Sequence, residues 1–209
     1  MKATKINKIV LGLSGGLDST LALLVAYRAA KILGLEPSTR IDAITMPGPA
    51  SSDRTQANAI SLANAIQVSS NTISINDLVK LEQKALKHNS KEDVAYENIQ
   101  ARARTNLLFN YANKNGGLVL GTGDLSEIAL GWCTYGGDHL SHYNVNGGIP
   151  KTLIKDLVQY ASQLSEFVTA KDILLDIIDT PISPELTASK SGEISQETES
   201  IIGSYVLHD

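Results

Sequence analysis

The chain has 209 residues, 43% of them hydrophobic and 19% charged, with a formal net charge of −4 at pH 7. This length favours one domain with a sizeable core, and the slight acidic excess lacks the basic field on which non-specific nucleic-acid binding depends. A single cysteine, Cys133, cannot form an internal disulfide, and no apolar run approaches the roughly 18 residues of a membrane span. We therefore expect a cytoplasmic protein that binds neither nucleic acid nor membrane.

Between residues 9 and 20 an apolar segment runs into a small, flexible turn and then directly into a helix pattern. Ser14, Gly15 and Gly16 leave their backbone N–H groups open to approach, so that these groups can surround one anion at the positive end of the helix. Asp18 lies in the first helical turn, where its carboxylate can bind a Mg²⁺ ion held by the same phosphate. The turn therefore predicts a phosphate site.

Other interpretations of this turn differ in how well they fit. A Walker P-loop needs a Gly-Lys-Ser/Thr ending, which is absent, and the Rossmann Gly-x-Gly-x-x-Gly pattern is also unmet. Residues 12–16 do match the Gly-x-Ser-x-Gly nucleophile elbow of hydrolases. His139 and His142 lie downstream, but nothing near either one marks it as a catalytic base. The elbow and a purely structural glycine turn remain as alternatives.

The first half of the chain alternates strand and helix patterns. A strand–helix–strand unit calls for a right-handed crossover and a parallel sheet, with ligands at the carboxyl ends of the strands. Met46 and the turn at residues 14–18 both fall at that edge. Strands are predicted over residues 6–13, 41–46 and 68–75. Three helices are predicted: one from residue 17 to its stop at Gly34, one from a Ser or Asp cap near residue 52 to residue 66, and one from Asn76 or Asp77 to residue 86.

A long helix is predicted over residues 93–114, followed by a stop at Gly116 and a strand over residues 118–121. Arg102 and Arg104 stand two positions apart in this helix and cannot face the same way, so we expect one to reach into a site while the other serves an ion pair or solvent. A second polar turn follows the strand, and Glu127 points from a short helix there toward the same sheet edge as Asp18. Two such carboxylates suit a Mg²⁺ ion that bridges ATP phosphates.

The longest irregular stretch covers residues 132–150, and loops of this length are usually functional or disordered. Cys133, His139 and His142 suggest zinc only weakly, because no convincing further ligand accompanies them; we expect them to pack or to form hydrogen bonds. Lys151 begins a helix over residues 151–161, where a cation is unfavourable unless an anion lies nearby. A helix over residues 170–178 and a rigid turn over residues 179–186 follow, and the polar residues 187–200 are expected to be mobile.

Several motifs together resemble one family. Ser-Gly-Gly-Leu-Asp-Ser at residues 14–19 resembles the PP-loop of the ATP pyrophosphatases, which cleave ATP between its α and β phosphates to adenylate a substrate. That motif alone leaves GMP synthetase, asparagine synthetase and tRNA-modifying enzymes open. Residues 121–127 (GTGDLSE), 134–138 (TYGGD) and 143–152 (YNVNGGIPKT) together resemble NAD⁺ synthetase, more in its glutamine-dependent than in its ammonia-dependent form.

The resemblance covers nearly the whole chain, and it implies a fold, a domain organisation and a reaction. The fold is α/β, a doubly wound, mostly parallel sheet with helices on both faces, of the adenine nucleotide alpha hydrolase-like type. Residues 1–186 would form the synthetase core and residues 187–209 a mobile or truncated segment, with the family's glutaminase domain absent from this chain. The reaction is the ATP-dependent amidation of deamido-NAD⁺ to NAD⁺ through an adenylate, with release of AMP and pyrophosphate.

The resemblance also implies roles for single residues. Asp18, Lys151 and Asp138 would be catalytic, and a Mg²⁺ ion would be bound by Asp18, Glu127 and Ser183. Ser183 is followed by Pro184, where the family pattern has a small residue. ATP would be bound by Ser14, Gly15, Gly16, Asp18, Ser19, Thr122 and Met46. The dinucleotide substrate would be bound by Arg102, Asp138, Tyr143, Asn144 and Lys151.

The implied partners are deamido-NAD⁺, ammonia delivered by a glutaminase domain, and further copies of the chain in a homo-oligomer. Cys133 does not match the catalytic cysteine of the glutaminase domain. Two alternatives stay open. One is another PP-loop enzyme that adenylates a different substrate before amidation, and the other is a nucleotide-binding module without catalysis.

Overall fold

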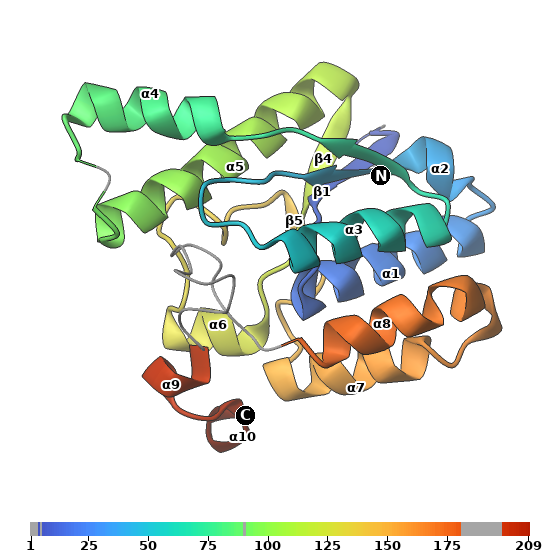
Figure 1. Ribbon diagram of the computed structural model, residues 1–209. Coiled ribbons are helices and arrows are strands. Elements are labelled where there is room, and N and C mark those ends of the chain that lie inside the picture. Colours follow the sequence, from blue (N-terminus) through green and yellow to red (C-terminus); the bar gives the residue numbers. More distant parts are fainter. Residues whose placement is uncertain (1–3, 5, 90, 181–197) are drawn as a thin grey trace.

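The computed structural model describes residue 4 and residues 6–89, 91–180 and 198–209. Its strands form one sheet in the order β3-β2-β1-β4-β5, and each neighbouring pair is parallel. This confirms the predicted parallel, doubly wound α/β fold. Figure 1 labels β1, β4 and β5 of this sheet. The strands are β1 (Lys8–Gly12), β2 (Ile41–Thr45), β3 (Ser69–Thr72), β4 (Gly117–Gly121) and β5 (Tyr143–Asn144).

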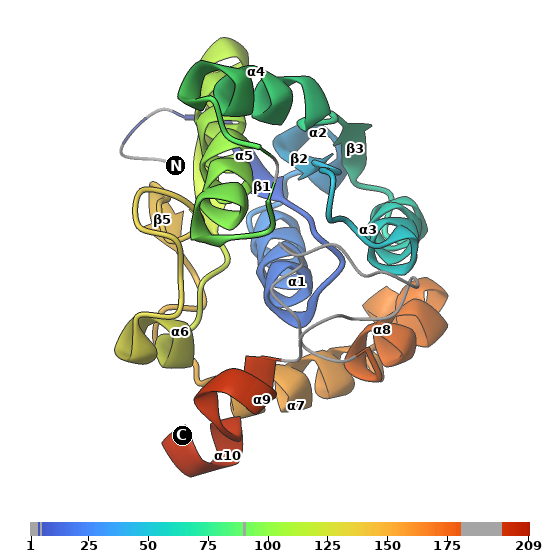
Figure 2. The same cartoon turned by 60° about the vertical axis from the view of Figure 1, so that its left-hand side comes forward.

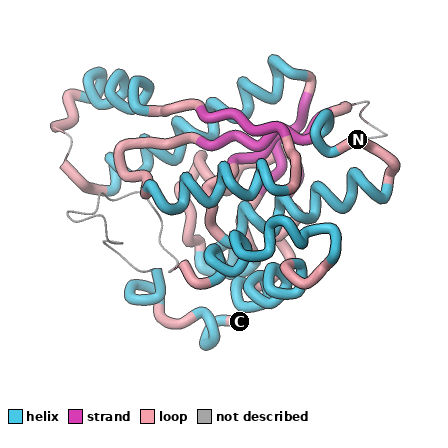
Figure 3. The backbone as a smooth tube through the Cα atoms, turned by 45° about the vertical axis from the view of Figure 1, so that its right-hand side comes forward, coloured by secondary structure: helices cyan, strands magenta, loops and turns pink. Residues whose placement is uncertain are grey.

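Helices cover both faces of the sheet (Figure 2), and Figure 3 shows the strands between them. One face carries α1 (Leu17–Ile32) and α3 (Asp53–Ala65), with α7 (Lys151–Ala161) and α8 (Lys171–Ile178) packed against these two helices; the other face carries α4 (Asn76–Leu86) and α5 (Val94–Asn115). The short helices are α2 (Pro37–Arg40), α6 (Leu125–Leu130), the 3₁₀ helix η1 (Ser165–Ala170), α9 (Thr198–Ile202) and α10 (Tyr205–His208).

The two faces of β1 show why this strand is central. Successive strand side chains point to opposite faces. Val10 packs in the apolar cluster under α4 and α5, whereas Leu11 packs in the larger cluster under α1 and α3; both are completely buried. A strand that buries both faces needs the near-continuous apolar sequence found here, which is typical of the interior of a parallel sheet.

Helix ends follow the predicted signals in most places. The Ser52 side chain accepts the Thr55 N–H at the start of α3, which confirms the expected Ser or Asp cap. Asp93 caps α5, and Gly116 ends it in the left-handed conformation at φ 64°. Helix α4 differs, because its N-cap is Ile75 and no side-chain cap forms there.

The structure differs from the sequence prediction at short elements. The third strand spans only Ser69–Thr72, and the four-residue helix α2 and the two-residue strand β5 were not predicted. Elements this short contain too few residues to show a periodic pattern. Strand β5 forms because residues 143 and 144 pair with Leu120 and Gly121 of β4, which brings the irregular stretch to the sheet edge.

The last described residues, 198–209, form α9 and α10, and α10 packs against α7. Tyr205 is only 2% exposed, so this part of the predicted mobile segment is anchored by an aromatic side chain. Residues 187–197 and Ser183 lie outside the described residues. No helix in the described part of the chain combines the length and apolar character needed to cross a membrane.

Candidate functional site

The loop between β1 and α1 has the backbone geometry of an anion site. Gly15 has φ +90°, and a Cβ atom there would collide with the carbonyl oxygen of Thr55 in α3, so glycine is required. Gly16 precedes α1 and offers no side-chain cap, and the first intrahelical bond runs from the Thr20 N–H to the Gly16 carbonyl at 3.1 Å. The N–H groups of residues 17–19 therefore open the helix with no acceptor in a preceding turn.

Two serines hold this loop in shape. The hydroxyl oxygens of Ser14 and Ser19 lie 3.1 Å apart, the Gly16 N–H donates to Ser14 Oγ at 3.1 Å, and the Ser14 N–H donates to Ser19 Oγ at 3.2 Å. Within the described residues, the Ser14 hydroxyl thus contacts the loop itself and not a histidine. The structure therefore does not supply the base that a hydrolase elbow needs.

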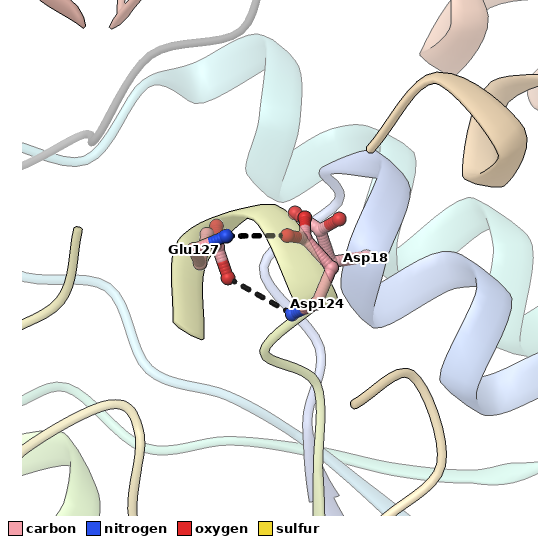
Figure 4. A group of neighbouring side chains, drawn as sticks. All are labelled: Asp18, Asp124 and Glu127. Atoms are coloured by element: carbon pink, nitrogen blue, oxygen red, sulfur yellow. Dashed lines mark hydrogen bonds between the residues drawn. The ribbon is translucent and has the colours of Figure 1, made fainter. Parts of the chain in front are cut away.

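Three carboxylates meet where β1 and β4 end. Asp18, Asp124 and Glu127 each place a carboxylate oxygen within 4.8 Å of the others (Figure 4). The expected approach of Glu127 to Asp18 is confirmed. Asp124 and Glu127 are held by a reciprocal capping box at the start of α6, because Asp124 Oδ1 accepts the Glu127 N–H at 2.7 Å and Glu127 Oε2 accepts the Asp124 N–H at 3.2 Å.

Asp124 is a functional candidate for which no role was predicted. It stands inside the motif at residues 121–127, three positions before Glu127. The Asp-x-x-Glu spacing of a capping box was the available signal. Its side chain is completely buried. Asp124 both caps the start of α6 and adds negative charge to the cluster around Lys151.

Lys151 supplies the positive charge of the cluster from the first turn of α7. Its Nζ lies 2.6 Å from Asp18 Oδ2, 2.7 Å from Asp124 Oδ2 and 3.1 Å from Glu127 Oε1, and its side chain is 3% exposed. This confirms that an anion lies beside the lysine. Burial alone would lower the pKa of Lys151, but the three carboxylates outweigh burial and raise it, so the amine stays protonated.

Two of these carboxyl groups, Asp18 and Glu127, have raised pKa values, and burial is the main cause for both. Burial, with the charge of Asp18 in addition, raises the pKa of Glu127 to about 7. Burial also raises the pKa of Asp18 against the opposing effect of Lys151. One ammonium therefore balances these carboxylates incompletely, which favours a further cation.

The donor atoms fit a magnesium ion. Carboxylate oxygens are the hard ligands that Mg²⁺ prefers, and Asp18 Oδ1 is buried without a hydrogen-bond partner. Among the described residues, the group that could hold a metal consists of Asp18, Asp124 and Glu127. Cys133, His139 and His142 are not part of such a group, so the zinc alternative finds no support.

The two histidines form hydrogen bonds, as expected. His142 Nδ1 accepts the Val119 N–H at 2.9 Å, and His139 Nδ1 lies 3.0 Å from the Thr134 carbonyl oxygen. The same loop holds Asp138, whose Oδ1 accepts the Thr134 N–H at 2.7 Å. These bonds shape the irregular stretch locally and keep it beside β4.

Two asparagines connect the irregular stretch to the strand ends. Asn146 is completely buried, and its Nδ2 donates to the carbonyl oxygens of Asp18 at 2.9 Å and Thr122 at 3.0 Å. Asn144 Nδ2 donates to the Gly123 carbonyl at 2.8 Å. Asn146 was not among the predicted site residues, although it lies in the motif at residues 143–152 and ties the β1 and β4 ends together.

The remaining predicted residues lie farther along the same edge. Arg102 is exposed and donates from Nε to the Tyr135 carbonyl at 3.1 Å, and Tyr143 is 63% exposed. Arg104 instead reaches the end of β2, where its Nε donates to the Met46 carbonyl at 3.1 Å. Of the two arginines, Arg104 is thus the one that contacts a strand end, whereas Arg102 lies beside the irregular stretch.

Comparison with known proteins identifies the family. The family model described as NAD synthase matches residues 1–195. The chain is 45% identical to the glutamine-dependent NAD(+) synthetase of Mycobacterium leprae over its whole length, which is 32% of that protein, and 36% identical to the NH(3)-dependent NAD(+) synthetase of Fusobacterium nucleatum over 81% of the chain and 63% of the relative.

A solved structure agrees with these relatives. The glutamine-dependent NAD+ synthetase of Acinetobacter baumannii, in complex with adenosine diphosphate, superposes with a TM-score of 0.76 at 32% identity, covering 87% of this chain and 33% of that one. The chain thus spans about a third of the length of the glutamine-dependent relatives it matches. With its parallel sheet, glycine turn and carboxylate cluster, the chain belongs to the NAD synthase family.

Proposed function

We propose that this chain carries out the ATP-dependent amidation of deamido-NAD⁺ to NAD⁺, with release of AMP and pyrophosphate. The observation that carries the proposal is the buried cluster of one lysine and three carboxylates beside the open N-terminus of α1. Membership of the NAD synthase family supports the reaction, and the relative solved with adenosine diphosphate supports a nucleotide at this fold.

The phosphate groups of ATP would lie in the loop between β1 and α1. The loop at residues 14–19 would bind and orient them through the backbone N–H groups that open α1 and the hydroxyls of Ser14 and Ser19. Gly15 and Gly16 would allow the close approach, and Thr122 and Met46 would flank the nucleotide at the neighbouring strand ends. Lys151, kept protonated, stabilises the negative charge of the departing pyrophosphate.

Asp18, Asp124 and Glu127 would hold Mg²⁺. When bound, the ion neutralises the charge of ATP phosphates. Ser183, predicted as a further ligand, lies outside the described residues, so its role stays a prediction. Each carboxylate is already held in place, since Asp18 pairs with Lys151 at 2.6 Å and the other two share the capping box of α6. The residues are therefore oriented before any ligand arrives.

The dinucleotide would lie along the irregular stretch, beside Arg102, Asp138, Tyr143 and Asn144. Its nicotinate carboxylate attacks the α-phosphorus of ATP, the bond to the β-phosphate oxygen breaks, and pyrophosphate leaves. Ammonia then attacks the carbonyl carbon of the resulting mixed anhydride, AMP leaves, and ammonia loses a proton to give the amide. Positioning and charge neutralisation supply most of the catalysis, because the protein forms no covalent bond.

We further propose a partner domain, an oligomeric state and a cellular location for this chain. The glutamine-dependent names of its relatives, of which it covers about a third, support ammonia delivery by a glutaminase domain. We place the synthetase core at residues 1–186, and we propose a homo-oligomer that works in the cytoplasm, where ATP and the dinucleotide are available.

Release of AMP tests the function directly. The complete protein is incubated with ATP, Mg²⁺, ammonium and deamido-NAD⁺, and AMP and NAD⁺ are measured by chromatography. We expect both products in equal amounts, and none without the dinucleotide. If xanthylate or aspartate replaces deamido-NAD⁺ as the required substrate, the chain is another adenylating amidase. ATP binding without AMP from any of the three would favour a nucleotide-binding module.

A further inference from the structure

Helix α7, which begins with Lys151, has no side-chain cap of its own. Pro150 precedes the helix and no side-chain cap bond forms there. The first two N–H groups find acceptors in other elements. Lys151 N–H donates to Ser126 Oγ in α6 at 3.0 Å, and Thr152 N–H donates to Asp209 Oδ2, just after α10, at 3.0 Å. The first turn of α7 is thus capped from two separate places, helix α6 and the residue that follows α10.

Asp209 joins these two caps into one chain of hydrogen bonds. The Ser126 hydroxyl donates to Asp209 Oδ1 at 2.5 Å, so the same carboxylate receives Ser126 and Thr152. Ser126 is then oriented to accept the Lys151 N–H. A carboxylate at a helix N-terminus is favoured by the helix dipole. Asp209 therefore holds the backbone of Lys151 indirectly, through one hydrogen bond to Ser126 and a second from the Lys151 N–H to Ser126.

Tyr205 acts on the other end of the same lysine. Its side chain is 2% exposed, and its ring centroid lies 5.6 Å from Lys151 Nζ, within reach of a cation–π interaction. The N–H of Tyr205 donates to Glu199 Oε1 of α9 at 3.0 Å, which fixes the start of α10. Residues 198–209 thus contact Lys151 through its backbone partner Ser126 and through its ammonium.

We propose that Asp209 and Tyr205 are positioning residues that hold Lys151 against Asp18, Asp124 and Glu127. Asp209 sets where the helix of Lys151 begins, and the Tyr205 ring covers its ammonium. Neither residue needs to contact a substrate. The importance of this positioning for the reaction rests on the proposed function, whereas the positioning itself can be measured without any reaction.

Chemical reactivity of the lysine tests the positioning. In the complete protein, Lys151 is acetylated with limiting acetic anhydride and quantified by peptide mass spectrometry, with Lys8, paired with Asp42 at 2.8 Å, as internal reference. We expect Asp209→Ala and Tyr205→Leu to raise acetylation of Lys151 about fivefold. Asp209→Asn and Tyr205→Phe, which keep an acceptor and the ring, should give smaller increases.

The matched control is Val206→Ala, because Val206 is 75% exposed on the same helix. It should leave the acetylation of Lys151 unchanged. Thermal unfolding of every variant shows whether it folds. Acetylation that rises equally at Lys8 and Lys151 in Asp209→Ala, or that does not rise at Lys151 in any folded variant, would overturn the proposal.

A kinetic cycle tests whether Asp209 acts through Lys151. Asp209→Ala should lower kcat for AMP formation about tenfold and change the KM for ATP less than about twofold, with Asp209→Asn in between. In a Lys151→Met background the same change should cost nothing further, because the group being positioned is gone. Losses that multiply would show that Asp209 acts elsewhere. If the unaltered protein forms no AMP, the proposed function fails, and the acetylation result still decides the positioning.

Discussion

Two ion pairs in this molecule have the same length and opposite surroundings. Lys151 Nζ lies 2.6 Å from Asp18 Oδ2, and Arg54 Nη2 lies 2.6 Å from Asp176 Oδ1. The side chains of the first pair are 3% and 24% exposed, whereas those of the second are 52% and 44% exposed. Distance alone would therefore rank the two pairs as equals.

Burial and charge balance separate them. The exposed pair joins one cation to one anion, Asn58 donates to the same carboxylate at 2.7 Å, and solvent screens the interaction. The buried pair belongs to a group in which one ammonium faces three carboxylates. Excess negative charge that is buried lowers the stability of the folded protein. Such charge is typical of functional sites, where a bound cation can balance it.

Lys151→Ala tests the buried group most severely. We expect the rate of AMP formation by the complete protein to fall about a hundredfold or more, because the cation that is proposed to stabilise the departing pyrophosphate is lost. The matched control is Lys155→Ala, an exposed lysine one turn later in α7, which should keep the full rate. Equal rates in the two variants would remove Lys151 from the reaction.

Asp18→Ala tests the opposite charge of the same pair. The expected loss is again about a hundredfold, with the folded state preserved in circular dichroism, since the carboxylate is proposed to bind Mg²⁺ beside the phosphates. Asp53→Ala is the control, because Asp53 lies exposed in the first turn of α3. The account is contradicted if added Mg²⁺ supports the same rate in Asp18→Ala as in the control.

A pH series distinguishes the two surroundings by the sign of their effects. The folded protein holds a proton on Glu127 with a pKa of about 7, against 4.5 for the ordinary group, with Asp18, Asp124 and Lys151 around it. Without metal, the free energy of unfolding should therefore fall as pH rises from about 4.5 to 7. Above that range it should fall no further on account of Glu127. Arg54 and Asn58 lower the pKa of Asp176, so its contribution is lost only as pH falls below 3.8.

Urea unfolding between pH 5 and 8, without metal, measures the first of these effects. Glu127→Gln keeps a side-chain acceptor for the Asp124 N–H and removes the titration, so its unfolding free energy should depend less steeply on pH than that of the unaltered protein. Asp176→Asn should leave the slope in this range as it was. Identical slopes in all three proteins would show that Glu127 does not titrate near neutrality.

Arg54→Ala should have the smallest effect. Exposed ion pairs contribute little, so the thermal midpoint should change by about 3 °C or less, and the rate of AMP formation should stay the same. Differential scanning calorimetry and the AMP assay check both. A large loss of activity in Arg54→Ala would mean that this exposed ion pair also supports the reaction.

The features that could be predicted from the sequence are those that a local pattern or the sheet topology determines. Long patterns predicted the parallel sheet and the meeting of Asp18 with Glu127, because parallel strands bring their carboxyl ends to one edge, whereas the helices on both faces were implied by the family resemblance. Asn146 was missed as a site residue because it acts through contacts with residues distant in the sequence. Asp124 was missed although its capping-box spacing is visible, because only the tertiary contact with Lys151 places its carboxylate in the cluster. The strand β5 and the packing of Tyr205 on Lys151 also depend on tertiary contacts that no local pattern records.

Exchange of labelled pyrophosphate into ATP, measured without ammonia, tests the central claim that the buried cluster supports adenylation of a dinucleotide. The reaction runs only if the carboxylate of deamido-NAD⁺ reversibly takes the adenylyl group. We expect exchange in the complete protein that requires deamido-NAD⁺, persists in Arg54→Ala and is lost in Asp18→Ala and Lys151→Ala. Exchange that proceeds without the dinucleotide, or that persists unchanged when Asp18 and Lys151 are replaced, would contradict the account.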